Sequence, residues 1–293
     1  MDFLIQLILT GIIVGSIYSV LAIGFVLIYK SSKVFNFAQG QFVLIGAYLG
    51  FSCLSEFQMS AFATVIVLCI SSFIIGYACD RIFLEKMIGQ AILPSIMMTI
   101  ALSYVLEGTS FIAWGGMTES YPSIYGIITV RILNAKLPIE YLIILGVAIF
   151  MVIALLVFFN YTRLGLAMKS TAESHEVSQA LGVNVKNVFA FSWAIAALSG
   201  CLGGALLANI NGVSPDFSEF GLKVFPVVIL GGLESIPGAI IGGMSLGLIE
   251  YLSMGYIDSI LPGFHTIVAY FILILILLIK PYGLFGLVRI ERI

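Results

Sequence analysis

Charged residues are scarce in this sequence. Asp, Glu, Lys and Arg make up 10% of its 293 residues and hydrophobic residues make up 61%, whereas a soluble domain carries roughly 25% charged residues. So few charges cannot cover a water-exposed surface, and we expect lipid to surround most of the chain. The formal net charge of −2, with Lys and Arg in short clusters between apolar stretches, argues against a nucleic-acid partner.

Motifs that bind nucleotide phosphates or catalytic zinc are also missing. The sequence contains no GxxxxGK[ST] phosphate loop and no HExxH. Its four Cys residues form no CxxC pair, and His175 and His265 have no ligand partner at a suitable spacing. We therefore predict that the chain is not an enzyme, that it needs no cofactor or metal, and that any energy from ATP comes from another polypeptide.

Long apolar stretches, by contrast, run through the whole chain. A helical span needs about 20 apolar residues, and eight stretches come near or exceed this length: residues 3–29, 37–54, 61–79, 91–114, 139–159, 188–210, 224–256 and 264–279. The first lacks the basic n-region of a secretory signal, so it is expected to remain as a membrane helix. The pattern predicts an all-α polytopic membrane protein with a single transmembrane domain over residues 1–293.

The stretch 224–256 differs from the others because Gly231-Gly232, Glu234 and Pro237-Gly238 interrupt it. Such residues break or kink a helix, so the stretch is either one broken span or a hairpin. With the N-terminus outside, a hairpin puts ten Lys and Arg residues inside and three outside, whereas a single crossing gives seven and six. Because cytoplasmic loops carry the excess of Lys and Arg, the hairpin is favoured.

Pairs of glycines four residues apart recur in the apolar stretches. This spacing puts both glycines on one face of a helix, where small residues let two helices approach closely. We predict helix packing at five such pairs: Gly11/Gly15, Gly46/Gly50, Gly200/Gly204, Gly238/Gly242 and Gly243/Gly247.

One long polar connection, residues 161–187, lies on the predicted cytoplasmic side. Ser170 and Thr171 precede the stretch from Ala172 to Leu181, which contains no Gly or Pro, and Gly182 follows it. Ser or Thr before such a stretch and Gly after it are signals for the start and end of a helix. Four apolar residues share one face of that helix: Ala172, Val177, Ala180 and Leu181. A short amphipathic helix between two spans must bury this face against something.

Four blocks of sequence resemble the permeases of branched-chain amino-acid ABC transporters, the Liv family, and in particular the shorter permease subunit. They are Gly15 to Tyr29 followed by Asn36-Phe-Ala-Gln-Gly40, then Ala180-Leu-Gly-Val-Asn184, then Val228 to Glu250, and finally Lys280-Pro-Tyr-Gly-Leu-Phe-Gly286. The blocks follow the family's order and cover nearly the whole chain.

The resemblance implies an importer that moves branched-chain or other hydrophobic amino acids across the bacterial inner membrane. The implied partners are two cytoplasmic ABC ATPase subunits, a second related permease subunit, a periplasmic or lipid-anchored substrate-binding protein and membrane lipid. It also implies that residues 161–187 form a coupling loop that docks in a groove of the ATPase. The candidate coupling residues are Arg163, Lys169, Ala172, Glu173, Glu176, Val177, Ala180, Leu181 and Gly182; the alternative is a solvated connecting helix.

Polar candidates for the substrate path are few. They are Tyr18 in the first stretch, Asn36 and Gln39 at the start of the second, and Gly231, Gly232 and Gly238 in the interrupted one. Asn36 fits a helix N-cap equally well. If Gly238 opens a half-helix inside the membrane, its free amide could meet a substrate carboxylate; tight glycine packing is the alternative.

Other functions need features that are harder to find here. A urea or short-amide permease of the same family would share the machinery and differ only in cargo. An ion channel or ion-coupled carrier would have repeated intramembrane charges or a carbonyl filter. An intramembrane enzyme would need a nucleophile with a base, or metal ligands, on facing helices.

Overall fold

The structure is a computed structural model, and it describes residues 2–122, 126, 128–132, 135–280 and 283–286. In chain order its α-helices are α1 (Asp2–Ser32), α2 (Gln39–Phe51), α3 (Ala61–Cys79), α4 (Ile92–Trp114), α5 (Ile139–Tyr161), α6 (Arg163–Glu173), α7 (His175–Ala180), α8 (Val185–Asn211), α9 (Ser218–Leu222), α10 (Val224–Gly231), α11 (Ile236–Tyr256) and α12 (Phe264–Ile279). A two-stranded antiparallel hairpin, β1 (Thr129–Ile132) and β2 (Ala135–Pro138), joins α4 to α5.

The predicted membrane helices are present. Within the described residues, six helices are long and apolar enough to cross a membrane: α1, α3 with its continuation to Met87, α4, α5, α8 and α11. The stretch 37–54 corresponds to α2 and the π-helical turn Ser52–Glu56 that continues it, and 264–279 corresponds to the shorter apolar helix α12. The all-α polytopic fold is confirmed, with the small β-hairpin as an addition that the apolar pattern did not indicate.

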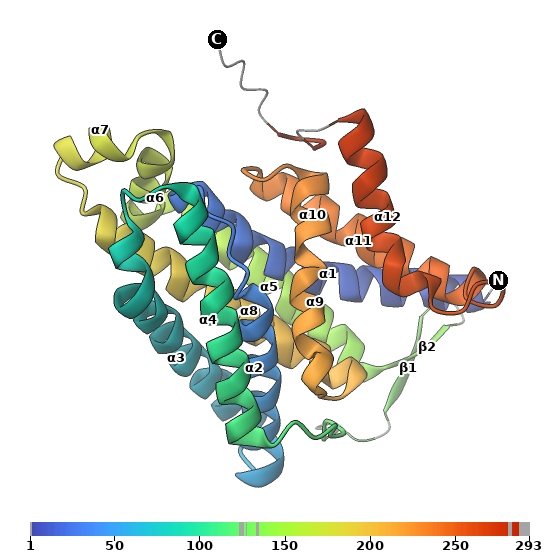
Figure 1. The fold of residues 1–293 in the computed structure, drawn as a ribbon. Helices are drawn as coiled ribbons and strands as arrows, with labels where there is room; N and C mark the ends of the chain where they lie inside the picture. The colour runs from blue at the N-terminus through green and yellow to red at the C-terminus, as the bar shows by residue number, and fades with distance from the viewer. Residues whose placement is uncertain (1, 123–125, 127, 133–134, 281–282, 287–293) are drawn as a thin grey trace.

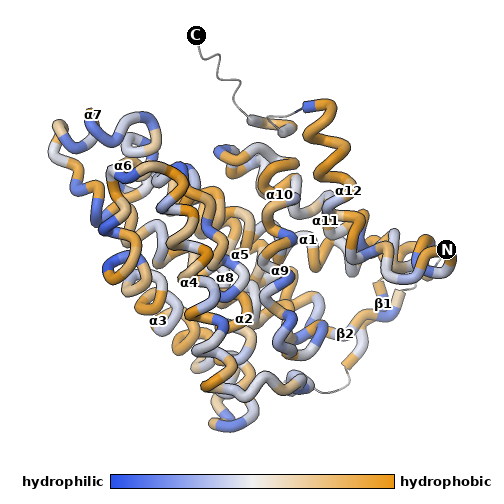
Figure 2. Tube along the Cα trace, viewed as in Figure 1, coloured by the Kyte–Doolittle hydropathy of each residue, from blue (hydrophilic) through white to orange (hydrophobic). Residues whose placement is uncertain are grey.

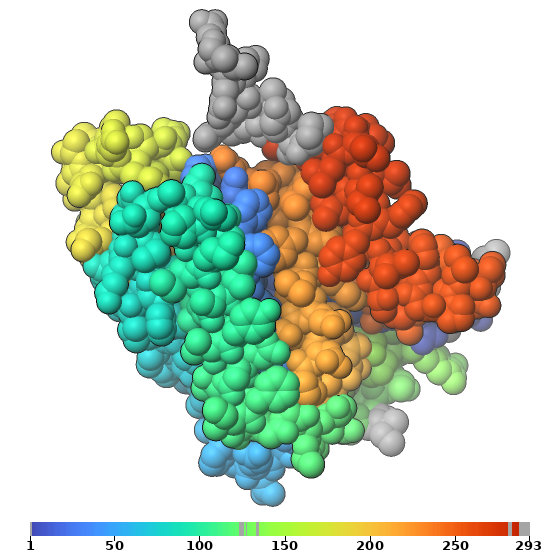
Figure 3. Space-filling view, in the orientation of Figure 1, coloured from blue at the N-terminus to red at the C-terminus, as the bar shows by residue number. Residues whose placement is uncertain are grey.

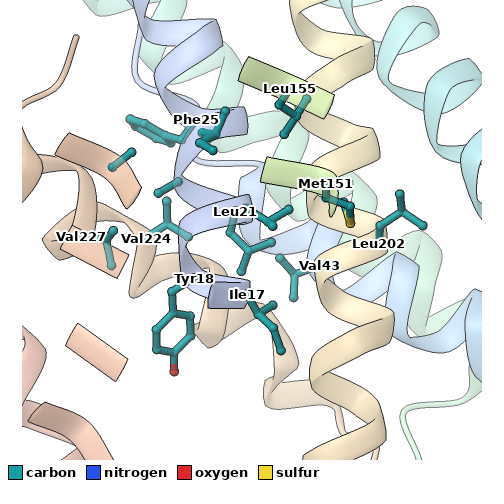
Figure 4. Packing of buried hydrophobic residues seen from close by; sticks show 14 of the residues in the cluster. Ile17, Tyr18, Leu21, Phe25, Val43, Met151, Leu155, Leu202, Val224 and Val227 are labelled. Carbon is teal, nitrogen blue, oxygen red and sulfur yellow. The ribbon is translucent and has the colours of Figure 1, made fainter. Parts of the chain in front are cut away.

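Helix α1 lies at the centre of the bundle (Figure 1). Ninety-four per cent of its most apolar part is buried, compared with 17% for α4. Figure 4 shows side chains of α1 enclosed by four other helices, through Val43 of α2, Met151 and Leu155 of α5, Leu202 of α8, and Val224 and Val227 of α10. The outer helices keep apolar side chains exposed, as expected for helices that face lipid or a partner subunit. Among them, α12 is hydrophobic along most of its length (Figure 2).

Glycines allow the central helices to touch. A Cβ on Gly46 of α2 would lie 2.1 Å from the carbonyl oxygen of Cys201 in α8, and one on Gly15 of α1 would lie 2.9 Å from that of Gly243 in α11. The predicted packing role of the paired glycines is confirmed. Residues 243–247 also match G-x-S-x-G, a motif that in some enzymes places a catalytic Ser at a turn between a strand and a helix. Here these residues lie inside α11, so they do not form that turn.

The stretch 224–256 is a hairpin, as the charge pattern favoured. Helix α10 is only eight residues long, and α11 returns beside it after a turn at Gly232–Ser235. Gly232 has φ +101°, a backbone conformation that suits glycine. The amides of Leu284 and Phe285 donate to the carbonyls of Leu230 and Gly231 at 2.8 and 3.2 Å, so these two residues lie beside this turn.

The connections divide between two ends of the bundle. One, here called the α6–α7 end, holds residues 80–90 and 162–187, the end of α1, the turn 232–235 and residues 280 and 283–286. The other, the N-terminal end, holds the start of α1, the β-hairpin and residues 211–223 and 256–264. Eight described Lys and Arg residues belong to the α6–α7 end and three to the N-terminal end. Arg289 and Arg292, counted on the basic side above, and Pro281 and Tyr282 lie outside the described residues.

The predicted helix from Ala172 to Leu181 is wrong in its boundaries. The chain forms α6 and α7 instead, with a break at Ser174, whose φ is −155°. The hydroxyl of Ser174 accepts the amide of Val177 at 3.2 Å and so caps α7. Ser170 and Thr171 lie within α6, where their hydroxyls donate to the carbonyl of Ala167. The hydrogen bond from the Val177 amide to the Ser174 hydroxyl competes with the backbone hydrogen bonds that would continue α6, and the helix breaks there.

Candidate functional site

Helix α6 attaches the 161–187 connection to the bundle. Thr162 caps its start, accepting the amide of Gly165 at 3.0 Å, and α6 contacts α1, α5 and α8. Met168, Thr171 and Ala172 are buried. Ala172, one of the predicted coupling residues, therefore faces the bundle and holds the segment in place.

Helix α7 presents apolar side chains to the outside. Val177 is 58% exposed and Leu181 is 77% exposed, and Ala180 is also exposed. The segment projects beyond the neighbouring helices (Figure 3). Exposed apolar groups at the tip of an otherwise hydrophilic segment (Figure 2) form a surface suited to binding another protein.

The charged coupling candidates fall into two groups. Arg163, Glu173 and Glu176 are exposed and are free to meet a partner. Lys169 turns toward the bundle instead: its Nζ donates to Asn160 Oδ1 at 2.8 Å and lies 4.9 Å from the centre of the Phe159 ring.

The ends of α7 are held by different means. At its start, the His175 ring packs edge-on against Phe189, with ring centres 5.5 Å apart. Burial, and to a lesser degree the charge of Lys33, lowers the pKa of His175, so the ring is neutral at pH 7. At its other end, Gly182 has φ +86° and donates its amide to the carbonyl of Gln179 at 3.0 Å. Glycine is favoured there because other residues rarely adopt this conformation.

A cavity of about 570 Å³ connects this segment to the α10–α11 turn. Lys30 of α1, Lys169 and Glu173 of α6, and Glu234 of the turn contribute to its lining. An ion pair between Lys33 Nζ and Glu234 Oε1, 2.7 Å long, ties the end of α1 to the same turn. Because α6 contacts α1 and this ion pair joins α1 to the turn, a displacement of α6 is positioned to act on both α1 and the hairpin.

Asn36 and Gln39 are fully buried and bonded internally. Asn36 Oδ1 accepts the amide of Ala38 at 3.0 Å, and its Nδ2 donates to Gln39 Oε1 at 3.2 Å. Gln39 Nε2 donates to the carbonyl of Ala196 in α8 at 3.3 Å. Ala38 rather than Asn36 occupies the N-cap position of α2. Gln39 thereby joins α2 to α8, Asn36 holds the Gln39 side chain in place, and neither residue lines the cavities near Lys30 and near Tyr18.

The three glycines of the interrupted stretch meet at the hairpin turn. A Cβ on Gly231 would lie 2.2 Å from the Gly238 carbonyl oxygen, and one on Gly232 would lie 2.6 Å from the amide of Gly286. The amide of Gly238 already donates to Ser235 Oγ at 3.0 Å. The donor proposed for a substrate carboxylate thus has an internal acceptor, and the glycines serve close packing.

We expect Gly238→Leu to abolish assembly of the folded chain. Its Cβ would lie 2.1 Å from the Gly231 carbonyl oxygen, and forcing the two backbones apart costs about 3 kcal/mol or more. Size-exclusion chromatography of a fluorescent fusion would measure the folded fraction, with Gly108→Leu as control because nothing lies within 4 Å of a Cβ there. Normal assembly of Gly238→Leu would refute the packing role.

Tyr18 belongs to a second cavity, of about 320 Å³, near the N-terminal end. Its hydroxyl donates to Glu250 Oε2 at 2.8 Å, and Lys223 Nζ forms an ion pair with Glu250 Oε1. The two charged side chains are 12% and 8% exposed. The sequence analysis did not predict that these three residues meet. The signal available in the sequence was Glu250, because a carboxylate inside an apolar stretch often marks a functional site.

Comparison with known proteins gives a consistent result. The family described as "Branched-chain amino acid transport system / permease component" matches residues 7–277. The chain is 28% identical over 305 residues to the high-affinity branched-chain amino acid transport system permease protein LivH of Escherichia coli (strain K12), covering 99% of this chain and 98% of that protein. It is 31% identical over 297 residues to the probable branched-chain amino acid transport permease protein LivH of Methanocaldococcus jannaschii, covering 96% and 92%.

One solved structure shares the fold. PsaBC from Streptococcus pneumoniae, determined in complex with Fab, matches with a TM-score of 0.54 at 16% sequence identity, over 96% of this chain and 93% of the other. The arrangement of helices is therefore one already seen in an experimentally determined protein.

Proposed function

This chain belongs to the family of branched-chain amino acid transport system permease components, and we propose that it lines the membrane path of an ABC importer for branched-chain amino acids. The near full-length similarity to LivH proteins supports this cargo. The exposed apolar tip of the α6–α7 segment is the observation that carries the mechanism. The described residues leave Val177 and Leu181 largely exposed, so both side chains would bury apolar surface by entering a groove on another protein.

The partners follow from what the chain does not provide. Because the sequence has no phosphate loop, two ABC ATPase subunits would supply the energy and bind the residues 161–187. A second, related permease would complete the path, and a periplasmic or lipid-anchored binding protein would deliver the amino acid. Closure of the ATPases on ATP would move α6, and the contacts of α6 with α1, together with the Lys33–Glu234 ion pair, would transmit this motion to the hairpin.

We further propose that the protein lies in the inner membrane with its N-terminus outside. The α6–α7 end carries eight described Lys and Arg residues against three at the N-terminal end, and cytoplasmic loops carry the excess of positive charge. This orientation puts the coupling segment in the cytoplasm, where ATP is available.

Uptake of radiolabelled leucine, isoleucine and valine tests this function, with urea measured in parallel. Cells carrying the complete transporter should take up leucine, and cells lacking only this chain should not. Depletion of ATP should stop the uptake. Chain-dependent uptake of urea alone would replace the proposed cargo, and uptake of leucine that does not depend on ATP would refute the ABC mechanism.

A further inference from the structure

An ion pair is buried beside the cavity at the N-terminal end. The cavity lies among α1, α9, α11 and α12, and its lining includes Tyr18, Lys223 and Glu250. Tyr18 comes sixteen residues after the start of α1, about 24 Å along the helix at 1.5 Å per residue. The cavity therefore reaches from the N-terminal end to the middle of the central helix.

A gain in the stability of the fold does not explain well why this ion pair is buried. Removing two charges from water carries a large desolvation penalty, and a well-packed apolar pair is often as stable. Intramembrane charges usually face a cavity or a path and serve function. Here Lys223 and Glu250 both border open volume, and Glu250 is held by the Tyr18 hydroxyl.

We propose that Lys223 and Glu250 form a binding site for the charged groups of a zwitterionic α-amino acid on its way through the membrane. The inference rests on the proposed function. Glu250 accepts the substrate ammonium while Tyr18 continues to donate to its other oxygen. Lys223, on a flexible stem, turns from Glu250 to the substrate carboxylate. One internal ion pair becomes two pairs with the substrate, so no charge is left uncompensated.

The rest of the cavity suits an aliphatic side chain. Val14, Phe220, Tyr251, Met254 and Tyr270 supply apolar surface, and the volume of about 320 Å³ lies at the small end of ligand pockets. Asp216 and Glu219 also line it and add negative charge that attracts an ammonium group.

The same arrangement selects against neutral cargo. Urea or a short amide has no full charge with which to replace either partner, so breaking the Lys223–Glu250 pair would leave two buried charges poorly compensated. Lys223 competes with the substrate ammonium for Glu250, and Glu250 competes with the substrate carboxylate for Lys223. This competition keeps substrate binding weak enough for release, which transport through a membrane path requires.

Two double variants test this proposal in the complete reconstituted importer. Lys223→Met with Glu250→Gln removes both charges, and Lys223→Glu with Glu250→Lys exchanges them, so neither leaves a single buried charge. We expect uptake of radiolabelled leucine per assembled importer to fall about tenfold or more in each. Lys136→Met, a change of the same kind at an exposed position of strand β2, should retain uptake within about twofold.

The outcomes separate binding from folding. Leucine uptake at the original level in either double variant would overturn the proposal, because transport would then not need these charges in their places. Failure of both variants to assemble would also overturn it, because the pair would then serve the fold. An unaltered importer that transports no branched-chain amino acid would instead overturn the proposed function.

Discussion

Gly46→Leu should leave almost no folded protein. A Cβ at this position would lie 2.1 Å from the carbonyl oxygen of Cys201 and 2.2 Å from its Cα. These are backbone atoms of α8, which cannot rotate away, so α2 and α8 would have to separate. Overpacking typically costs 1–3 kcal/mol and occasionally more, and we expect at least about 3 kcal/mol here. The folded yield after detergent extraction and the thermal unfolding midpoint would measure the loss.

Gly146→Leu is the matched control. Gly146 lies in α5, is exposed, and has nothing within 4 Å of a Cβ. The substitution adds the same side chain to a membrane helix but points it outward, so stability should change by about 0.5 kcal/mol at most. Equal yields for the Gly46 and Gly146 variants would show that α2 and α8 pack less closely than these distances require.

Val177→Asp combined with Leu181→Asp should abolish ATP-driven uptake while the membrane bundle stays folded. Both side chains are largely exposed, so the folded chain loses little by the exchange. In the proposed ATPase groove, however, each would bury a carboxylate in place of an apolar anchor. Buried anchors at interfaces are each worth about 2 kcal/mol or more, so ATPase affinity should fall by about 100-fold or more. Co-purification of the ATPase and leucine uptake would measure the effect.

An equivalent change at the opposite end provides the control. Ile260 and Leu261 are exposed apolar residues between α11 and α12, at the N-terminal end. Ile260→Asp with Leu261→Asp should leave the ATPase bound. If the ATPase instead remains bound to the Val177 and Leu181 double variant, the tip of α7 is not the docking surface.

Much of the architecture was predictable because a membrane protein encodes it in local composition. Each of the eight apolar stretches corresponds to helix, and the hairpin at 224–256 was foreseen from its glycines and prolines and from the distribution of Lys and Arg. Lipid imposes one requirement on every span, that its backbone polar groups are satisfied within it. Length and hydrophobicity are therefore sufficient to find a helix.

Short polar segments were less predictable. The break at Ser174 depends on a single hydroxyl that caps α7 rather than leaving α6 to continue, and Ser170 and Thr171 offered the same chemistry four and three residues earlier. Several local signals of similar strength compete in such a segment. The contacts of α6 with the bundle then select among them.

The sequence by itself determined the membrane class, the spans, the hairpin, the position of the long polar connection 161–187 and the family. Only the tertiary structure decided which glycines meet which helix, that Asn36 and Gln39 join α2 to α8, and that Tyr18, Lys223 and Glu250 converge on one cavity. Tyr18 and Glu250 are 232 residues apart, and Lys223 and Glu250 are 27 apart. Hydrophobic pattern and helix signals act over a few residues along the chain, whereas these meetings depend on how whole helices pack, and no local pattern encodes that packing.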